Sequence, residues 1–249
     1  GVSAWMYTSN YKYPATTLTD SIANDLFFVP EVIGVKIALG DHRSSFPTTQ
    51  QVLAVLAEVR VGAMIAGKTG FLHIHTGNIP GAFEMYDEIL AKGFPIKHIR
   101  PTHCGRIRHV FDSAVEFGKK GGWIDITTGA SCCFDHPAQA VIEAVGMGVD
   151  PTHITLSTDG HGSVPRFNEK GEMVGLGVGG VDGNLKETIR LISDYKMPIE
   201  QALLFTTKNV GDALGLKDQG RVEVGACANA CLFTEDFNLT HVVARGRVM

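Results

Sequence analysis

The chain has 249 residues, of which 44% are apolar and 19% are charged, and its formal net charge at pH 7 is −4. This composition favours one large folded domain, with or without a small appendage, and argues against a disordered or nucleic-acid-binding chain. The sequence contains no apolar run of membrane-spanning length and no signal peptide, and its five cysteines are irregularly spaced. We therefore predict a cytoplasmic protein with no nucleic-acid or membrane partner and without a disulfide framework.

Short apolar runs alternate with stretches of helical periodicity along the first two thirds of the chain. The apolar runs, rich in β-branched residues, span residues 3–8, 32–39, 70–75, 99–103, 123–127 and 154–157. The helical stretches span residues 48–62, 81–92, 110–118 and 137–147. Continuous apolar runs separated by helices are typical of a buried parallel sheet built from βαβ units.

The last third of the chain has a different pattern. Residues 175–183 are rich in glycine, but they do not join a strand directly to a helix as a phosphate-binding loop does, so we predict a mobile loop. Helices are predicted at residues 184–195, 198–204 and 209–214, followed by short strands and turns. We therefore predict a domain of alternating strands and helices over residues 1–216 and a small β appendage over residues 217–249.

Polar side chains stand at or just beyond the ends of the apolar runs. Tyr11 follows the first run, and Lys36 lies within the second. His75 and His103 end the third and fourth runs, and Asp159 follows the sixth. In a (β/α) barrel the carboxyl ends of the strands form the active face, so these side chains predict one functional site.

The segment TGFLHIHTGN places two histidines on one strand. His73 and His75 are two residues apart, so both side chains point to the same side of the strand. Such a pair can chelate one metal ion, but only His75 closes the run. We interpret His75 as a candidate ligand and His73, one layer deeper, as a polar group of the core.

Two residues have a structural and a chemical interpretation. Lys36 lies inside an apolar strand, GVKIALGD, where an uncompensated charge is costly. It either forms a salt bridge, for instance with Asp41, or reacts as a neutral amine with carbon dioxide to give a carbamate that bridges two metals. Asp159, in LSTDGHGS, is either a turn cap or a functional carboxylate.

The segments GVKIALGDHR, HIHTGN, RPTHCGR and LSTDGHGS resemble the amidohydrolase superfamily, and within it the isoaspartyl (β-aspartyl) dipeptidase family. The resemblance includes AWMYTSNYKYP and VARGRVM and so extends over nearly the whole chain. Each motif is short, but their order and spacing together are specific. The resemblance implies an α/β fold of the (β/α)8 TIM-barrel type, a homo-oligomer, and a zinc-dependent dipeptidase that hydrolyses β-aspartyl peptide bonds.

The resemblance also implies a metal site. Lys36 would carry a carbamate that bridges two zinc ions, His75 and His103 would bind one zinc, and Asp159 would bind the other. A hydroxide between the metals would attack the scissile carbonyl. Asp159 would accept the proton of the hydroxide and deliver it to the leaving amine.

Four further residues match positions that contact the substrate in this family. Tyr11 would polarise the carbonyl oxygen, and Ser163 would contact the dipeptide. Arg43 and Arg106 would hold substrate carboxylates, a role that suits the forked guanidinium group. Taken singly, Tyr11 could be an ordinary strand-end aromatic and the arginines could form surface ion pairs.

The sequence departs from the family pattern at its start. The family carries a His-x-His pair on the first barrel strand, but no such pair precedes Lys36, and six strands are predicted instead of eight. We therefore interpret the chain as an incomplete barrel that lacks the first two βα units and is not a competent enzyme by itself. The alternatives are another dinuclear amidohydrolase of the dihydroorotase or hydantoinase type, which acts on cyclic amides, and a non-catalytic barrel fragment.

Overall fold

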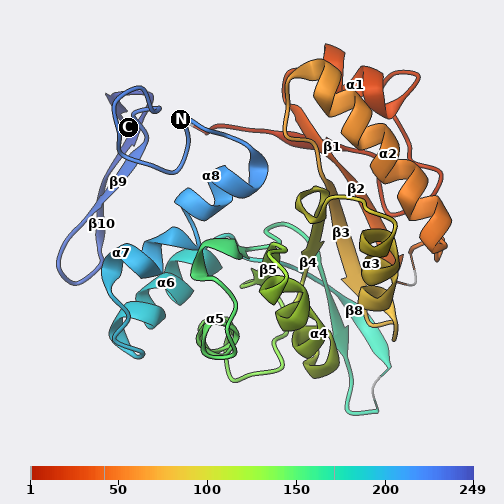
Figure 1. Ribbon diagram of the computed structural model, residues 1–249. Coiled ribbons are helices and arrows are strands. Elements are labelled where there is room, and N and C mark those ends of the chain that lie inside the picture. Colours follow the sequence, from red (N-terminus) through yellow and green to blue (C-terminus); the bar gives the residue numbers. More distant parts are fainter. Residues whose placement is uncertain (1, 42, 171) are drawn as a thin grey trace.

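The computed structural model describes residues 2–41, 43–170 and 172–249. Strands form at the six predicted positions: β1 (Met6–Thr8), β2 (Val32–Gly40), β3 (Leu72–Gly77), β4 (Ile99–Thr102), β5 (Ile124–Thr127) and β6 (Ile154–Ser157). β1 to β4 make one parallel sheet in chain order, and β5 pairs in parallel with β6. With helices between successive strands, this is an incomplete (β/α) barrel, as predicted (Figure 1).

Successive residues of these strands alternate between a polar inner face and an apolar outer face. Strand register places Lys36, His73 and Arg100 in one row across β2, β3 and β4. His75 and Thr102 stand side by side in the row two residues further on. The residues that flank these rows along the strands are buried hydrophobic side chains of the core, among them Val35, Ile37, Leu72 and Ile74. The runs that look uniformly apolar in the sequence therefore present their few polar side chains together on one side.

The seven predicted helices all form, each within four residues of its predicted ends. They are α2 (Thr49–Ala66), α3 (Ala82–Ala91), α4 (Arg108–Lys119), α5 (Pro137–Gly146), α6 (Gly183–Ser193), α7 (Ile199–Leu204) and α8 (Lys208–Leu214). Short 3-10 turns, Ile96–His98 and Pro151–His153, precede β4 and β6. The sequence prediction missed α1 (Ile22–Phe28), a two-turn helix whose N-cap, Ser21, accepts a hydrogen bond from the Asn24 backbone.

Helix α2 is the one helix among the described residues that is long and apolar enough to cross a membrane, although the sequence reading found no such run. Its start is set by a capping box between Thr48 and Gln51, and its end by Gly67 in the left-handed region. The helix packs on α1, β2 and β3 and contributes Leu56 and Val59 to the core. Its apolar character is accounted for in part by this packing, since a third of the helix is buried.

The glycine-rich stretch is not a plain loop, and here the prediction was wrong. β7 (Ser163–Phe167) and β8 (Met173–Val178) form an antiparallel hairpin, which takes up the first part of the predicted loop. Only the segment 179–182 separates β8 from α6. Glycines give little side-chain signal for a strand, so the pairing with β7, and not the local sequence, decides this conformation.

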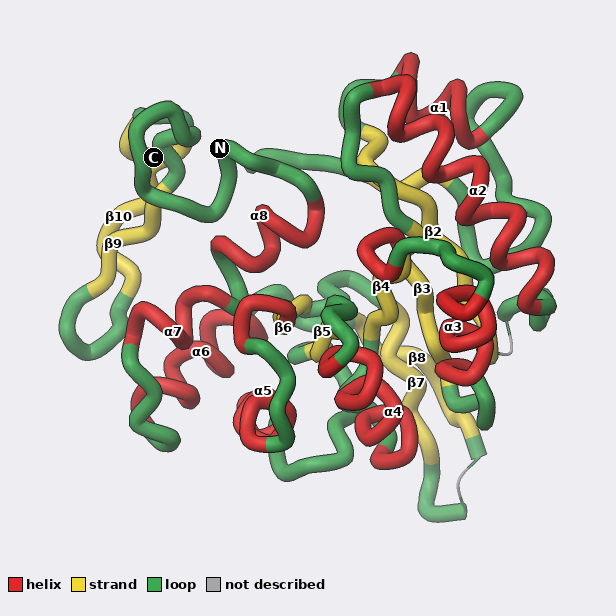
Figure 2. The backbone as a smooth tube through the Cα atoms, in the orientation of Figure 1, coloured by secondary structure: helices red, strands yellow, loops and turns green. Residues whose placement is uncertain are grey.

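The end of the chain forms a separate antiparallel sheet. It contains β9 (Ala230–Phe233), β10 (Leu239–Ala244) and β11 (Arg247–Val248), in the order β11-β10-β9. Figure 2 shows this sheet beyond α8, on the opposite side of the molecule from α2 and α3. The strands agree with the short β elements expected there, while the domain division at residue 216 stays a prediction.

Candidate active site

The carboxyl ends of β3 and β4 bring two buried imidazoles together. The ring centroids of His75 and His103 lie 4.6 Å apart. His75 Nε2 lies 3.1 Å from a carboxylate oxygen of Asp41, and among the described residues its buried Nδ1 has no hydrogen-bond partner. His103 Nδ1 lies 2.6 Å from the hydroxyl of Thr127. Burial first, and nearby cationic side chains second, lower the pKa of both imidazoles, to about 4 for His75. Both rings are therefore neutral near pH 7, which is the form that binds metals.

Lys36 faces the same end of the barrel from β2. Burial lowers the pKa of its amine to about 8, although Asp159 and Asp125 favour the charged form. The salt bridge to Asp41 considered from the sequence is not formed among the described residues, because Asp41 lies 2.8 Å from Arg43 and 3.1 Å from His75. An amine with a sizeable neutral fraction near pH 8 meets the first requirement for reaction with carbon dioxide.

A cavity of about 600 Å³ opens at these strand ends. Six of the eight predicted site residues line it, namely Tyr11, Arg43, His75, Arg106, Asp159 and Ser163. The other two adjoin it: Lys36 Nζ lies 5.8 Å from the centroid of the Tyr11 ring, and His103 contacts His75. The fold therefore gathers all eight residues around one cavity.

The two predicted arginines are held by carboxylates at this cavity. The Arg43 guanidinium lies 4.5 Å from the centroid of the Tyr11 ring and donates to Asp41 through Nε and Nη2. Arg106 Nη2 donates to Asp159 Oδ2 at 3.0 Å, while Arg106 Nε is buried without a partner among the described residues. The Asp159 side chain thus faces an arginine in the cavity, which favours the functional carboxylate over the turn cap. Both arginines line the cavity and both form ion pairs, and because the Arg43 side chain is 41% exposed the surface ion pair stays an alternative for Arg43.

Three non-glycine residues near the cavity have a left-handed backbone. The φ angles are 65° at His103, 52° at Asp159 and 59° at His161. Such conformations cost of the order of 1–3 kcal/mol each and concentrate at functional sites, where surrounding contacts enforce them. Two of the three are predicted metal ligands, so this strain supports a functional interpretation of the strand ends.

The predicted metal ligands have only part of the geometry that a metal site requires. His75 offers a buried nitrogen that lacks a hydrogen bond, and His103 has one nitrogen anchored on Thr127, as metal-binding histidines commonly do. Lys36 and Asp159 complete the predicted set, although Asp159 is engaged by Arg106. Among the described residues, no group of three or more His, Cys, Asp or Glu side chains is close enough to hold a metal ion. The chain thus offers a pair of neutral imidazoles and an adjacent lysine, and the full ligand set stays a prediction.

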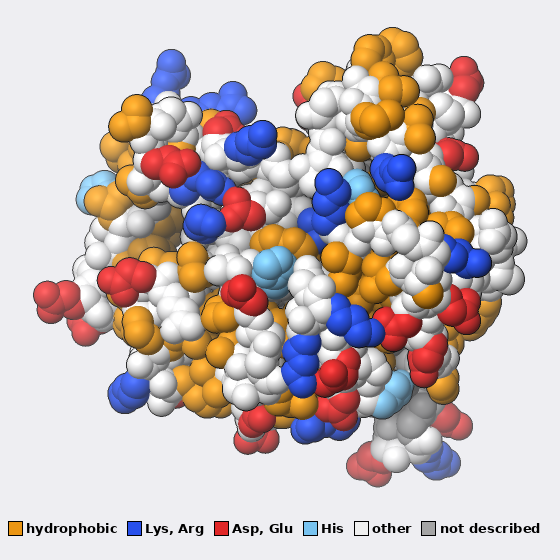
Figure 3. All heavy atoms as spheres, in the orientation of Figure 1, with side chains coloured by type: hydrophobic (Ala, Val, Ile, Leu, Met, Phe, Trp, Pro, Cys, Tyr) orange, Lys and Arg blue, Asp and Glu red, His pale blue; other side chains and the backbone are white. Residues whose placement is uncertain are grey.

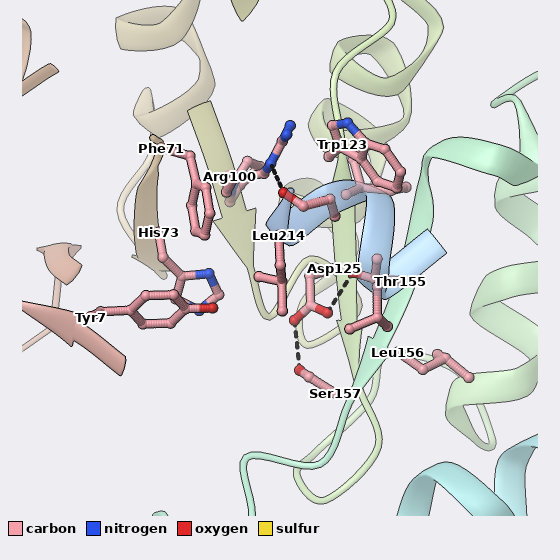
Figure 4. Close-up of a pocket in the computed structure, with 14 residues that line it drawn as sticks. Tyr7, Phe71, His73, Arg100, Trp123, Asp125, Thr155, Leu156, Ser157 and Leu214 are labelled. Atoms are coloured by element: carbon pink, nitrogen blue, oxygen red, sulfur yellow. Dashed lines mark hydrogen bonds between the residues drawn. The ribbon is translucent and has the colours of Figure 1, made fainter. Parts of the chain in front are cut away.

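A second cavity of about 160 Å³ lies deeper inside the strand array, and Figure 4 shows its lining. His73 stacks on Tyr7 there with ring centroids 4.9 Å apart, which agrees with its interpretation as a polar group of the core. Arg100 and Asp125 are further polar residues of this lining. The sequence analysis missed Asp125 and Thr127, although their two-residue spacing in the run IDIT signals one face of a strand.

Comparison with known proteins identifies the family to which this fold belongs. Residues 67–249 match the model of the amidohydrolase family. A β-aspartyl dipeptidase from Fervidobacterium islandicum AW-1, solved with the β-Asp-Leu dipeptide, is 34% identical with a TM-score of 0.92. The match covers 100% of this chain and 65% of that one. A second structure of the F. islandicum dipeptidase is 31% identical with a TM-score of 0.88, over 100% of this chain and 64% of that one.

A more distant likeness concerns the fold alone. N-acetylglucosamine-6-phosphate deacetylase from Pasteurella multocida is 13% identical with a TM-score of 0.59, over 88% of this chain and 57% of that one. The fold is therefore shared with other amidohydrolase-type structures, and the roles of the polar side chains at its strand ends stay predictions. The chain belongs to the amidohydrolase family. It spans about two thirds of the length of the dipeptidase structures that it resembles.

Proposed function

We propose that this chain carries most of the active site of a zinc-dependent dipeptidase that hydrolyses β-aspartyl (isoaspartyl) peptide bonds. The observation that carries the proposal is the cavity in which Arg43 and Arg106 face the His75 side of the candidate metal site. A β-aspartyl dipeptide has two carboxylates near its scissile bond, and two guanidinium groups suit them. The similarity to a dipeptidase solved with β-Asp-Leu supports the same substrate class.

In this proposal Lys36, as a carbamate, would hold two zinc ions together with His75, His103 and Asp159. Bound zinc would lower the pKa of the attacking water and polarise the scissile carbonyl. The neutral state of both imidazoles leaves their nitrogens free to act as ligands. The low pKa of Lys36 keeps part of this amine in the uncharged form that carbamylation requires.

The remaining steps belong to the side chains of the cavity. Asp159 accepts a proton from the attacking water and passes it to the amine that leaves when the C–N bond breaks. Tyr11 donates its hydroxyl proton in a hydrogen bond to the carbonyl oxygen. Burial raises the pKa of Tyr11, which keeps this hydroxyl protonated at neutral pH. Because Arg106 now binds Asp159, a substrate carboxylate that binds Arg106 would release Asp159 for proton transfer.

The first test is the zinc content of the purified chain, measured by elemental analysis after incubation with zinc and bicarbonate. Two zinc ions per chain would mean that these residues complete both metal positions. One or none would mean that the residues of this chain do not complete both metal positions. A zinc-loaded form of the protein that leaves β-Asp-Leu intact would refute the proposed activity.

A single substitution tests the substrate class. Arg106→Met, introduced into a form of the protein that cleaves β-Asp-Leu, should abolish that cleavage while the zinc content stays the same, because the guanidinium binds the substrate and no metal. Arg108→Met is a matched control, since Arg108 pairs with Asp112 on the exposed face of α4. If Arg106→Met behaves like Arg108→Met, the amidohydrolases that act on cyclic amides become the better assignment.

A further inference from the structure

Asp125 is a buried carboxylate that gathers three hydroxyl groups from neighbouring strands. It lies on β5 and faces the inside of the strand array (Figure 4). One carboxylate oxygen accepts from Thr102 and Ser157, both at 2.6 Å, and the other accepts from Thr155 at 2.8 Å. Buried carboxylates are rare unless hydrogen bonds compensate them, and here all three partners are side chains of adjacent strands.

Two of the three donors stand one or two residues before candidate ligands. Thr102 is the last residue of β4 and precedes His103, and Ser157 is the last residue of β6 and lies two residues before Asp159. Both ligands have the left-handed backbone described above, so the chain turns sharply within two residues of each of these hydroxyls. Hydrogen bonds that hold Thr102 and Ser157 in place therefore also position the backbone of His103 and Asp159.

The sheet itself does not supply this restraint between β4 and β5. The strand ladder joins β1 to β4 in one sheet and β5 to β6 in another, and no ladder pairs β4 with β5 among the described residues. The gap is bridged by the hydroxyl bond from Thr102 to Asp125 and by the backbone bond from Cys104 N to Asp125 O at 3.0 Å. Thr127, two residues after Asp125 on the same face of β5, then contacts His103 Nδ1.

We propose that Asp125 is a positioning residue that sets His103 and Asp159 relative to each other by holding Thr102 and Ser157. It touches neither metal nor substrate and acts through the two strand ends. This role rests on the proposed function as far as metal binding is concerned, but the orientation of His103 is a property of the metal-free chain as well.

The neighbouring hydroxyls provide a matched pair of variants. Thr102→Val and Thr155→Val each remove one hydroxyl bond to Asp125 and keep the size and shape of the side chain. Only Thr102 adjoins a candidate ligand, whereas Thr155 contacts Asp125 from the middle of β6. A merely structural role would make the two variants equivalent, and a positioning role separates them.

Two measurements would be made on the unaltered chain, Asp125→Asn, Thr102→Val and Thr155→Val. The first is zinc affinity by competition with a chromophoric chelator. We expect about a 10-fold to 100-fold loss in Asp125→Asn and Thr102→Val, the usual effect of removing a partner that orients a ligand, and an affinity close to that of the unaltered chain in Thr155→Val. Equal losses in both threonine variants, or no loss in Asp125→Asn, would overturn the proposal.

The second measurement is the ¹⁵N shift of the His103 ring in the metal-free chain, assigned with His103→Gln. We expect Asp125→Asn and Thr102→Val, but not Thr155→Val, to move the Nδ1 resonance away from its hydrogen-bonded value. Unchanged or uniformly changed shifts would refute the positioning role whether or not zinc binds. If these shifts respond as expected but the zinc-loaded protein leaves β-Asp-Leu intact, the proposed function fails while the positioning role stands.

Discussion

The buried carboxylate of Asp25 holds together the segment that leads to Tyr11. One oxygen accepts from the Leu18 backbone at 2.8 Å and from the Thr8 hydroxyl, and the other accepts from the Thr19 backbone and hydroxyl, both at 2.7 Å. These bonds tie the end of β1 to the loop after it and to α1. We predict that Asp25→Asn destabilises the protein and loosens this loop.

The size of the effect follows from the hydrogen bonds. The amide side chain introduced by Asp25→Asn keeps one acceptor oxygen and therefore two of the four bonds, while its NH2 group faces the two remaining donors. Hydrogen bonds to a charged group contribute roughly 1.5–3 kcal/mol each, and the exposed position of Leu18 favours the low end. Two lost bonds give a destabilisation of about 3 kcal/mol.

Urea unfolding followed by circular dichroism measures this loss. With a slope of about 2 kcal/mol per M, a loss of about 3 kcal/mol lowers the midpoint by about 1.5 M. Asp150→Asn is the matched control, because Asp150 accepts bonds from the Thr152 backbone and hydroxyl at an exposed turn. Its cost should be at most about 1 kcal/mol.

The effect should also depend on pH in a defined direction. Burial opposes the charge of Asp25, but the four hydrogen bonds outweigh it and lower its pKa from the ordinary value of 3.8. The stabilisation is therefore complete above pH 3.8 and disappears as the pH falls through the lower folded-state pKa. The stability difference between the native protein and Asp25→Asn should shrink over that acid range. A difference below about 1 kcal/mol at pH 7, or one that grows in acid, would refute this account of the four bonds.

Three further substitutions or treatments test other features of the fold. Gly77→Ala should cost at least about 1–3 kcal/mol in urea unfolding, since φ is 73° and an added Cβ would lie 2.2 Å from the backbone oxygen of Gly40. Arg100→Met should raise the free energy of unfolding by about 1–2 kcal/mol, because Arg100 is a buried cation with no ion pair among the described residues. A lower free energy of unfolding would show that its single hydrogen bond to Ala213 and its aromatic contacts outweigh the cost of burying the charge. Burial raises the pKa of Cys104, so a thiol reagent should label exposed Cys231 in the native chain and reach Cys104 only on unfolding, as mass spectrometry of the labelled peptides would reveal.

One face of the molecule carries an exposed apolar area over the ends of α1 and α2 (Figure 3). It includes Phe27 and Phe28 of α1 and Met64 and Ile65 of α2, which are between 51% and 73% exposed. The sequence pattern does not single out these side chains, because apolar residues occur on both the buried and the exposed faces of α2. The burial of each one depends on what packs against the helix.

Local patterns in the sequence determined most of the secondary structure. Apolar β-branched runs formed the six barrel strands, and periodic stretches between them formed the helices, because these preferences act over neighbouring residues. The sequence also predicted that His75, His103 and Asp159 stand at strand ends and lie close together, since the carboxyl ends of parallel strands share one edge. The substrate-binding roles proposed for Arg43 and Arg106 came from family resemblance, because no spacing rule indicates them.

Contacts between segments far apart in the chain were decided only by the tertiary structure. The sequence allowed a salt bridge between Lys36 and Asp41, but in the fold Asp41 pairs with Arg43 and His75. It also pairs β8 with β7 where glycine suggested a loop. In the sequence Asp125 is only one polar residue in an apolar run, and the fold brings hydroxyl groups of β4 and β6 into hydrogen-bonding distance of it. These partners are set by strand register and long-range packing. The energies of such contacts depend on proximity in three dimensions, so the neighbouring residues in the sequence do not predict them.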